Sequence, residues 1–363
     1  MPLRPLVLAL VVASSASLAF AQTQPAPAST ETPADAVAAP DPDAVFKGRM
    51  GGTFGKSVQE VMPATKRVAV AAFRVAFVTD NSITAQVRGA YLPGMDMSGA
   101  RSSFYVTLKG VEPKTLQAIT DRAYADFLQQ IAASGREVVP MEQFRDSFAG
   151  FKVTGSPQQP HTKEQNGQTA TFFSPTGMPL VFTHFETGWG GFGNFDLTNY
   201  RKLQEISSQV NATVIAPMLV VNFARMSSSG NQSGLMSRTA ETGGELSMSV
   251  AALNSIYIRT EEFRNGMLMK GDEGSLQMAA AIASPMQFGT MQTISEDDNR
   301  AVRTAVNVLG MFAGIANAGG AARSVKKAVA TTTDDTYAAP ANDALSRTSA
   351  AFGRWWKKYP ATP

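Results

Sequence analysis

Few residues of this sequence could carry out acid–base or metal chemistry. It contains two histidines, His161 and His184, and no cysteine, so thiol nucleophiles, disulfides and cysteine-ligated zinc are excluded. His184 and Glu186 are two positions apart in an apolar run, and in a strand both side chains would lie on one face. Because two ligands fall short of a zinc site, a structural hydrogen bond is the simpler interpretation. We predict no metal site.

Two glycine-rich segments come close to nucleotide-binding motifs. Residues 50–57 (MGGTFGKS) end as a phosphate-binding P-loop does, but Met50 replaces its first glycine and a polar linker precedes it instead of a strand. Residues 188–193 (GWGGFG) contain the G-x-G-x-x-G spacing in a loop-like region. A dinucleotide site needs a strand before this motif and a helix after it. We therefore predict no cofactor.

Acidic residues are scattered along the chain. Their one cluster, Glu296-Asp297-Asp298, is expected at the start of a helix, where the helix dipole favours negative charge. A glycosidase uses two carboxylates that can come from distant parts of a sequence. A secreted hydrolase of that kind stays an alternative, but no residue is assigned a catalytic role.

The chain ends in a cluster of aromatic and basic residues, namely Trp355, Trp356, Lys357, Lys358 and Tyr359. Aromatic rings beside basic groups suit a membrane interface or a groove on a protein partner. The alternative is a tail that packs on its own domain. These five residues are the candidate site for binding a membrane or a partner.

Residues 304–322 form a long segment without charge, and Gly310 and Gly314 give it the G-x-x-x-G spacing of paired membrane helices. Asn307, Asn317 and several glycines make the segment poorly apolar. A helix packed against the domain is therefore favoured over a membrane span.

The amino terminus has the three parts of a secretory signal peptide. Arg4 supplies positive charge, residues 6–12 are apolar, and Ala19 and Ala21 form an A-x-A cleavage site before Gln22. The apolar stretch is too short to cross about 30 Å of hydrocarbon, so a cleaved signal is predicted instead of an anchor. Gln22 also stands where a lipoprotein needs cysteine. We expect an exported protein, located in the periplasm, at the outer membrane or outside the cell.

Composition narrows the class of partner. The formal net charge is only +3, which gives no general attraction to nucleic acid. The charged fraction of 17% is below the average of about 25%. Without disulfides the fold depends on its core, and the chain after residue 21 is long enough to bury one. No nucleic-acid partner is expected.

The elements that must position these residues alternate between strand and helix. Residues 67–79 and 213–226 are rich in β-branched and aromatic side chains, as buried strands are. Residues 113–131 and 197–210 have helical spacing of apolar residues. Gly135 is placed to end the first helix.

The remaining segments complete a single predicted domain over residues 46–330. Residues 80–103 and 150–196 are interpreted as long loops or solvated hairpins, with a strand expected at residues 180–185. Asn265-Gly266 predicts a hairpin turn, and a last helix is expected over residues 299–330. Residues 22–45 and 331–363 have the composition of a disordered linker and a flexible tail.

The segments KRVAVAAF at residues 66–73, GREVV at residues 135–139 and ATVIA at residues 212–216 resemble strands of the curli-secretion lipoprotein (CsgG-like) family of envelope assembly domains. The segment KRVAVAAF at residues 66–73 is similar to the family's first strand. The segment GREVV at residues 135–139 matches its G-x-x-V-V pattern after an amphipathic helix, and ATVIA at residues 212–216 is similar to a later strand. The long strand around residues 248–258, together with the Asn265-Gly266 turn that follows it, resembles the last hairpin of the family. The resemblance covers residues 66–270.

This resemblance implies an α/β fold, in which a mixed β-sheet is flanked by amphipathic helices and carries long loop insertions. It also implies a non-enzymatic role in binding or assembly, through a protein partner or self-association. No lipidation cysteine is present, Ala216 replaces a glycine of the family, and the family's membrane-inserting hairpins are not recognisable, so pore formation is not implied. A secreted hydrolase and a peripheral membrane protein are the two alternatives.

Overall fold

The computed structural model describes residues 41–50, 58–87, 90–92, 95–97, 99–153, 160–165, 167–183, 197–233, 237–265, 267–294 and 322–362. They all belong to one compact unit, Pro40–Pro363. The predicted signal peptide, most of the predicted linker and residues 304–321 of the uncharged segment lie outside the described residues.

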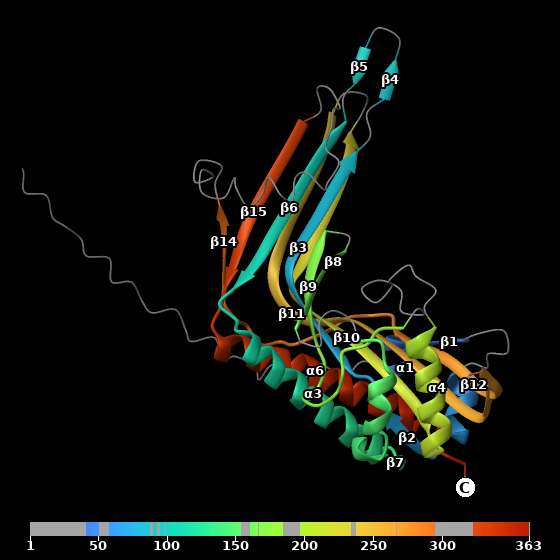
Figure 1. The fold of residues 1–363 in the computed structure, drawn as a ribbon. Coiled ribbons are helices and arrows are strands. Elements are labelled where there is room, and N and C mark those ends of the chain that lie inside the picture. The colour runs from blue at the N-terminus through green and yellow to red at the C-terminus, as the bar shows by residue number, and fades with distance from the viewer. Residues whose placement is uncertain are drawn as a thin grey trace, which may run out of the picture. The chain divides into compact units, whose positions relative to one another are not determined.

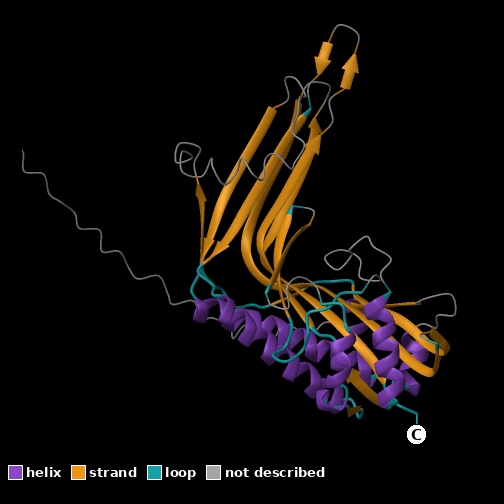
Figure 2. Cartoon of the chain, in the orientation of Figure 1, coloured by secondary structure: helices purple, strands orange, loops and turns teal. Residues whose placement is uncertain are grey.

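The described residues form a mixed α/β fold around a sheet of 13 strands, as predicted (Figures 1 and 2). The strands are β1 (Phe46–Met50), β2 (Arg67–Val70), β3 (Arg74–Val87), β6 (Ala100–Lys109), β7 (Glu137–Val138), β8 (His161–Gln165), β9 (Gln168–Phe173), β10 (Thr213–Ser233), β11 (Ser237–Arg264), β12 (Met267–Met278), β13 (Ile282–Ala283), β14 (Thr290–Ile294) and β15 (Ala322–Thr331). A separate small pair joins β4 (Ala90–Leu92) and β5 (Met95–Met97).

The main path through the sheet runs β1-β12-β11-β10-β3-β6-β15-β14. β3 is parallel to β10 and antiparallel to β6, and β15 is parallel to β6. β10 and β11 pair from Val214–Ile258 to Ser233–Ser237, so they form one long hairpin. The sheet is therefore built from hairpins that parallel contacts join.

The helices are α1 (Pro42–Val45), α2 (Val58–Val61), α3 (Pro113–Ala133), α4 (Thr198–Val210) and α6 (Asp334–Lys357), with 3₁₀ turns at Met62–Ala64, Met141–Gln143 and Arg145–Gly150. The predicted start of α3 at Pro113 is confirmed, because proline fits the first helical turn, where its missing N–H is not needed. Gly135 follows the helix with φ +83°, the left-handed conformation that glycine adopts without strain.

Helices cover both faces of the lower part of the sheet (Figure 1). On one face, Leu203 and Ile206 of α4 pack against Val214 of β10 and Ile258 of β11. On the other, residues of α3 and α6 join the core that contains Ile215 and Tyr257. A strand whose residues are buried on both faces needs a nearly continuous apolar run, and the sequence of β10 has one.

The structure corrects three predictions of local structure. Residues 322–330 were predicted to end a helix, but they form β15, which pairs with β6 and β14. Residues 334–357 were predicted to be a flexible tail, but they form α6, where Tyr337 and Leu345 are buried. No strand is present at residues 180–183. The fold therefore extends through residue 362 and starts before Phe46, since Val45 is already buried.

Candidate interaction surface

Two long hairpins dominate the sheet, one formed by β3 and β6 and the other by β10 and β11. Their inner faces meet, because Ser102 Oγ and Thr242 Oγ1 lie 2.8 Å apart at a buried position. Gly244 lies against Phe104, and a Cβ atom there would be only 2.8 Å from the Phe104 ring. The two hairpins therefore pack face to face, and the absence of a side chain at Gly244 leaves room for the Phe104 ring.

A polar junction lies where the pairings of β3 with β9 and of β10 with β11 are each interrupted by a bulge. The pairing of β3 with β9 shifts register after Val78, and the pairing of β10 with β11 shifts at Asn222. Asn81 Nδ2 donates to Asn222 Oδ1 at 3.3 Å, and Gln168 Nε2 donates to Asn81 Oδ1 at 2.9 Å. Asn222 Oδ1 also accepts from the backbone N–H of Ala224. Bulges bend strands, and these amide side chains satisfy polar groups at the bend.

The side of β3, β6, β15 and β14 that faces away from the second hairpin is rich in hydroxyl, amide and basic groups. We call it the outer face. The pairing register assigns it Ser82, Thr84 and Gln86 of β3; Arg101, Ser103, Tyr105, Thr107 and Lys109 of β6; Val325, Lys327 and Val329 of β15; and Gln292 and Ile294 of β14.

Two hydrogen bonds confirm that alternate residues share this outer face. Thr84 Oγ1 and Ser103 Oγ lie 2.9 Å apart, and Thr107 Oγ1 donates to Asp80 Oδ1 at 2.7 Å. Ser102, one residue from Ser103, points the opposite way toward Thr242. This is the side-chain alternation of a strand.

The outer face carries cations without acidic partners. Lys109 is exposed, and Arg101 and Lys327 are partly exposed. None of the three forms an ion pair with a carboxylate of the described residues. By the pairing register, Asp80 of β3 is the one acidic residue among those assigned to the outer face. Its carboxylate accepts hydrogen bonds from Thr79 and Thr107. Val325, 48% exposed, adds an apolar patch among them.

The aromatic residues of the predicted carboxyl-terminal site lie in the core. Trp355 and Trp356 are fully buried on α6, and Trp356 Nε1 donates to Tyr257 Oη at 3.4 Å. Lys357 is exposed, Lys358 forms an ion pair with Asp41 at 3.2 Å, and Tyr359 stacks near Trp355. The structure thus shows the alternative, a tail packed on its own domain, so the two tryptophans do not form a surface for a membrane or a partner.

A buried arginine holds this end of the chain. Arg136 donates to the carbonyls of Thr65 and Met62 at 3.1 and 3.2 Å, to that of Trp356 at 3.3 Å, and to that of Tyr359. Its guanidinium also lies 4.7 Å from the centre of a Trp356 ring, a cation–π contact. Burial lowers the pKa of Arg136 to about 10. No sequence pattern predicts this contact, because its partners are far apart along the chain.

The amino-terminal ends of α3 and α6 meet at an open hollow lined by Gly110, Glu112 and residues 332–335. Asp334 Oδ1 accepts from the backbone N–H of Glu112 at 2.8 Å. This hydrogen bond lowers the pKa of Asp334, because it favours the charged carboxylate. The start of α3 is therefore satisfied by Asp334 and that of α6 by the Thr333 capping box, so neither helix end needs an external anion.

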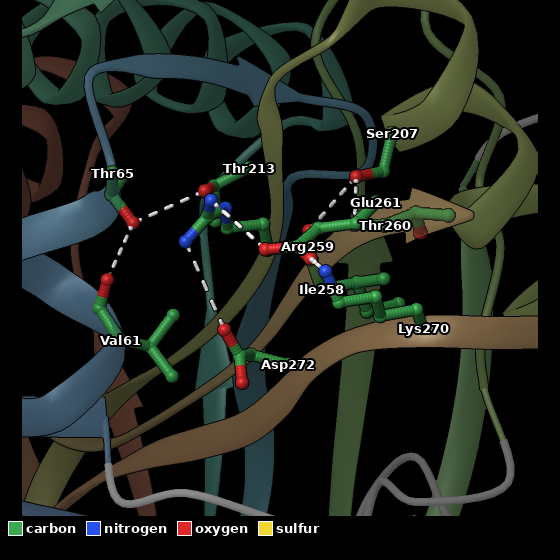
Figure 3. A network of polar contacts seen from close by, with 10 residues as sticks. All are labelled: Val61, Thr65, Ser207, Thr213, Ile258, Arg259, Thr260, Glu261, Lys270 and Asp272. Atoms are coloured by element: carbon green, nitrogen blue, oxygen red, sulfur yellow. Dashed lines mark hydrogen bonds and ion pairs between the residues drawn. The ribbon is translucent and has the colours of Figure 1, made fainter.

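A polar network joins α4 to the strands beside it (Figure 3). Ser207 Oγ accepts from the backbone N–H of Thr260 at 2.9 Å. Arg259 pairs with Glu261 at 3.1 Å and with Asp272 at 3.8 Å, and Lys270 pairs with Glu261 at 2.7 Å. Since each charge here has an opposite neighbour, the network stabilises the β11–β12 hairpin and is not a candidate binding site.

The structure gives no support for a catalytic centre among the described residues. His161 lies on β8, where burial lowers its pKa, and no group of three or more His, Asp or Glu is placed to hold a metal in the part of the chain that the structure describes. His184, Glu186, both glycine-rich motifs apart from Met50 of the first, and the acidic cluster at residues 296–298 lie outside that part. The described residues offer no constellation for acid–base chemistry.

Comparison with family models, with curated proteins and with solved structures finds no match to this chain. None of the helices in the described ranges is both long and apolar enough to cross a membrane.

Proposed function

We propose that this chain is an exported, non-enzymatic component of the cell envelope that acts in binding or assembly through its paired hairpins. The observation that carries the proposal is the length of β10 and β11 beyond the helix-covered part of the sheet (Figure 1). From Arg225 to Asn231 the residues of β10 are exposed or partly exposed. A hairpin of this length contributes little to the core there, so a role at the surface accounts for it.

The signal peptide predicted at residues 1–21 supports export, and the envelope is the compartment that such a protein reaches. The three segments that resemble the curli-secretion lipoprotein family correspond to β2, β7 and β10, which are neighbours in one sheet. This spatial agreement favours an assembly-type domain over the hydrolase alternative.

Shortening the second hairpin tests the proposal. Ser227 pairs with Gly243, so replacing residues 228–242 by Asn-Gly keeps the register and closes a two-residue turn. Expressed from residue 1, the trimmed protein should keep the near-ultraviolet circular dichroism of its buried tryptophans, Trp355 and Trp356. It should lose most of its association with the envelope fraction and with cross-linked partners.

The matched control shortens a different hairpin. Thr260 pairs with Gly271, so residues 261–270 are replaced by Asn-Gly in the same way. This variant should retain envelope association. If the trimmed β10–β11 protein associates and cross-links as the parent does, the proposal is wrong.

A further inference from the structure

From the outer face we infer a ligand class: we propose that it binds a linear anionic polysaccharide. This inference rests on the proposed binding function and names the ligand. It follows from three features of the face, namely its cations without ion pairs among the described residues, its neutral hydrogen-bonding groups and its small width.

The cations form a line along the strand direction. Arg101 and Lys109 are both on β6, and Lys327 lies on β15 beside Tyr105, midway between them. Residues four apart in a strand are separated by about 13 Å, so the three charges are spaced along about 27 Å. A linear polymer with repeated acidic groups matches such a line better than a single small anion does.

Neutral polar groups on the two flanking strands, β3 and β14, favour a sugar over a purely electrostatic partner. Ser82, Thr84, Gln86 and Gln292 share the outer face with the cations. Hydroxyl and amide groups both donate and accept hydrogen bonds, as sugar hydroxyls require. Tyr105 presents a partly exposed aromatic ring in the same row as Lys327, and the C–H face of a sugar ring can pack against it.

The size of the face argues against a folded protein as the partner. Four strands at about 4.8 Å spacing are about 15 Å wide, which with the length above gives roughly 400 Å². A standard protein interface buries about 800 Å² on each partner. A single extended chain needs no more area than the outer face offers.

Binding to polygalacturonate tests the inference, with dextran of similar length as the neutral control. The full mature protein should bind polygalacturonate at about 0.1 M ionic strength, where the Debye length is about 10 Å, and not bind dextran. The triple variant Arg101→Gln, Lys109→Gln, Lys327→Gln should bind at least about tenfold more weakly, because its charge-assisted contacts are lost.

A second triple variant serves as the control, because it also removes three positive charges but from positions away from the outer face. Lys47, Arg122 and Lys357 are exposed cations away from the outer face, and their change to glutamine should alter the affinity by less than about twofold, since net charge alone contributes little at a distance. Tyr105→Ser should weaken binding without changing its salt dependence. Equal losses in the two triple variants would overturn the assignment to the outer face.

Two further outcomes are decisive. If the protein ignores polygalacturonate but binds phosphatidylglycerol vesicles through the same three cations, the ligand is a lipid surface and the polysaccharide assignment is wrong. The length of the polymer after incubation is measured as well. If the polymer is bound through the outer face and also shortened, the ligand class stands and the proposal of a non-enzymatic function fails.

Discussion

Replacing Arg136 by methionine should lower the free energy of unfolding by about 3 kcal/mol. Burial of the guanidinium lowers its pKa from 12.5 to about 10, which corresponds to a cost of about 3 kcal/mol for keeping it charged. The arginine persists in the fold because its hydrogen bonds offset this cost. Methionine removes the cost, but it also leaves the carbonyls of Met62, Thr65, Trp356 and Tyr359 without this donor.

The net change in the free energy of unfolding depends on how many of those carbonyls lose their only donor. Met62 O and Trp356 O keep the backbone N–H donors of Thr65 and Tyr359, so the substitution deprives only the carbonyls of Thr65 and Tyr359 of their donor, at about 1–3 kcal/mol each. Loss of the cation–π contact with Trp356 adds about 2 kcal/mol. The relieved desolvation cost offsets about 3 kcal/mol of this total. Arg136→Lys keeps the charge but presents a single nitrogen in place of the planar fork, and it should destabilise at least as much as methionine.

Urea unfolding followed by tryptophan fluorescence measures the loss, because Trp355 and Trp356 are buried beside this arginine. The control is Arg122→Met, an exposed arginine on the same helix-and-loop region, which should change stability by less than about 0.5 kcal/mol. If Arg136→Met is as stable as the parent protein, or if lysine restores full stability, the argument that the fork holds this end of the chain is refuted.

Three other perturbations have defined outcomes. Gly244→Val should cost about 1–3 kcal/mol in thermal or urea unfolding, since the new side chain meets Phe104, whereas Gly243→Val, whose nearest contact is at 3.5 Å, should cost less. Burial raises the pKa of Tyr124 to about 12, so its neutral form is favoured in the folded state; the stability it supports is complete below pH 10 and is lost as the pH rises toward 12. Alkaline unfolding followed by circular dichroism should therefore begin at higher pH in Tyr124→Phe, and an unchanged midpoint would contradict this assignment. Gly135→Ala should cost about 1 kcal/mol because of the left-handed backbone; a neutral effect on the melting temperature would show that the loop relaxes.

Strong local patterns were sufficient for some elements. The helices α3 and α4 follow from apolar residues at helical spacing and from their end signals, Pro113 and Gly135 for α3. The Asn265-Gly266 turn follows from its residue types, and Asn265 has φ 51°, as such a turn requires. Each of these elements is specified by residues within one short segment, so its prediction does not depend on contacts with distant parts of the chain.

In α6 the helical spacing of apolar residues was outweighed, in the prediction, by a composition typical of disordered segments. Tyr337, Ala341 and Leu345 recur at helical spacing and are buried, and Thr333 caps the first turn. Pro340 inside the helix and the many small polar residues favoured a disordered tail instead. Packing against α3 and the sheet supplies the stability that the local sequence lacks.

The sequence by itself determined the class of fold, the helices α3 and α4, the hairpin turn at Asn265-Gly266 and the absence of thiol chemistry. Only the tertiary structure decided that residues 322–331 form a strand and that Trp355 and Trp356 lie in the core. It alone brought Arg101, Lys109 and Lys327 onto one face. The physical reason is that these features depend on partners far apart along the chain: β15 is a strand because β6 and β14 satisfy its backbone, and the outer face exists because the register of three strand pairs aligns its side chains.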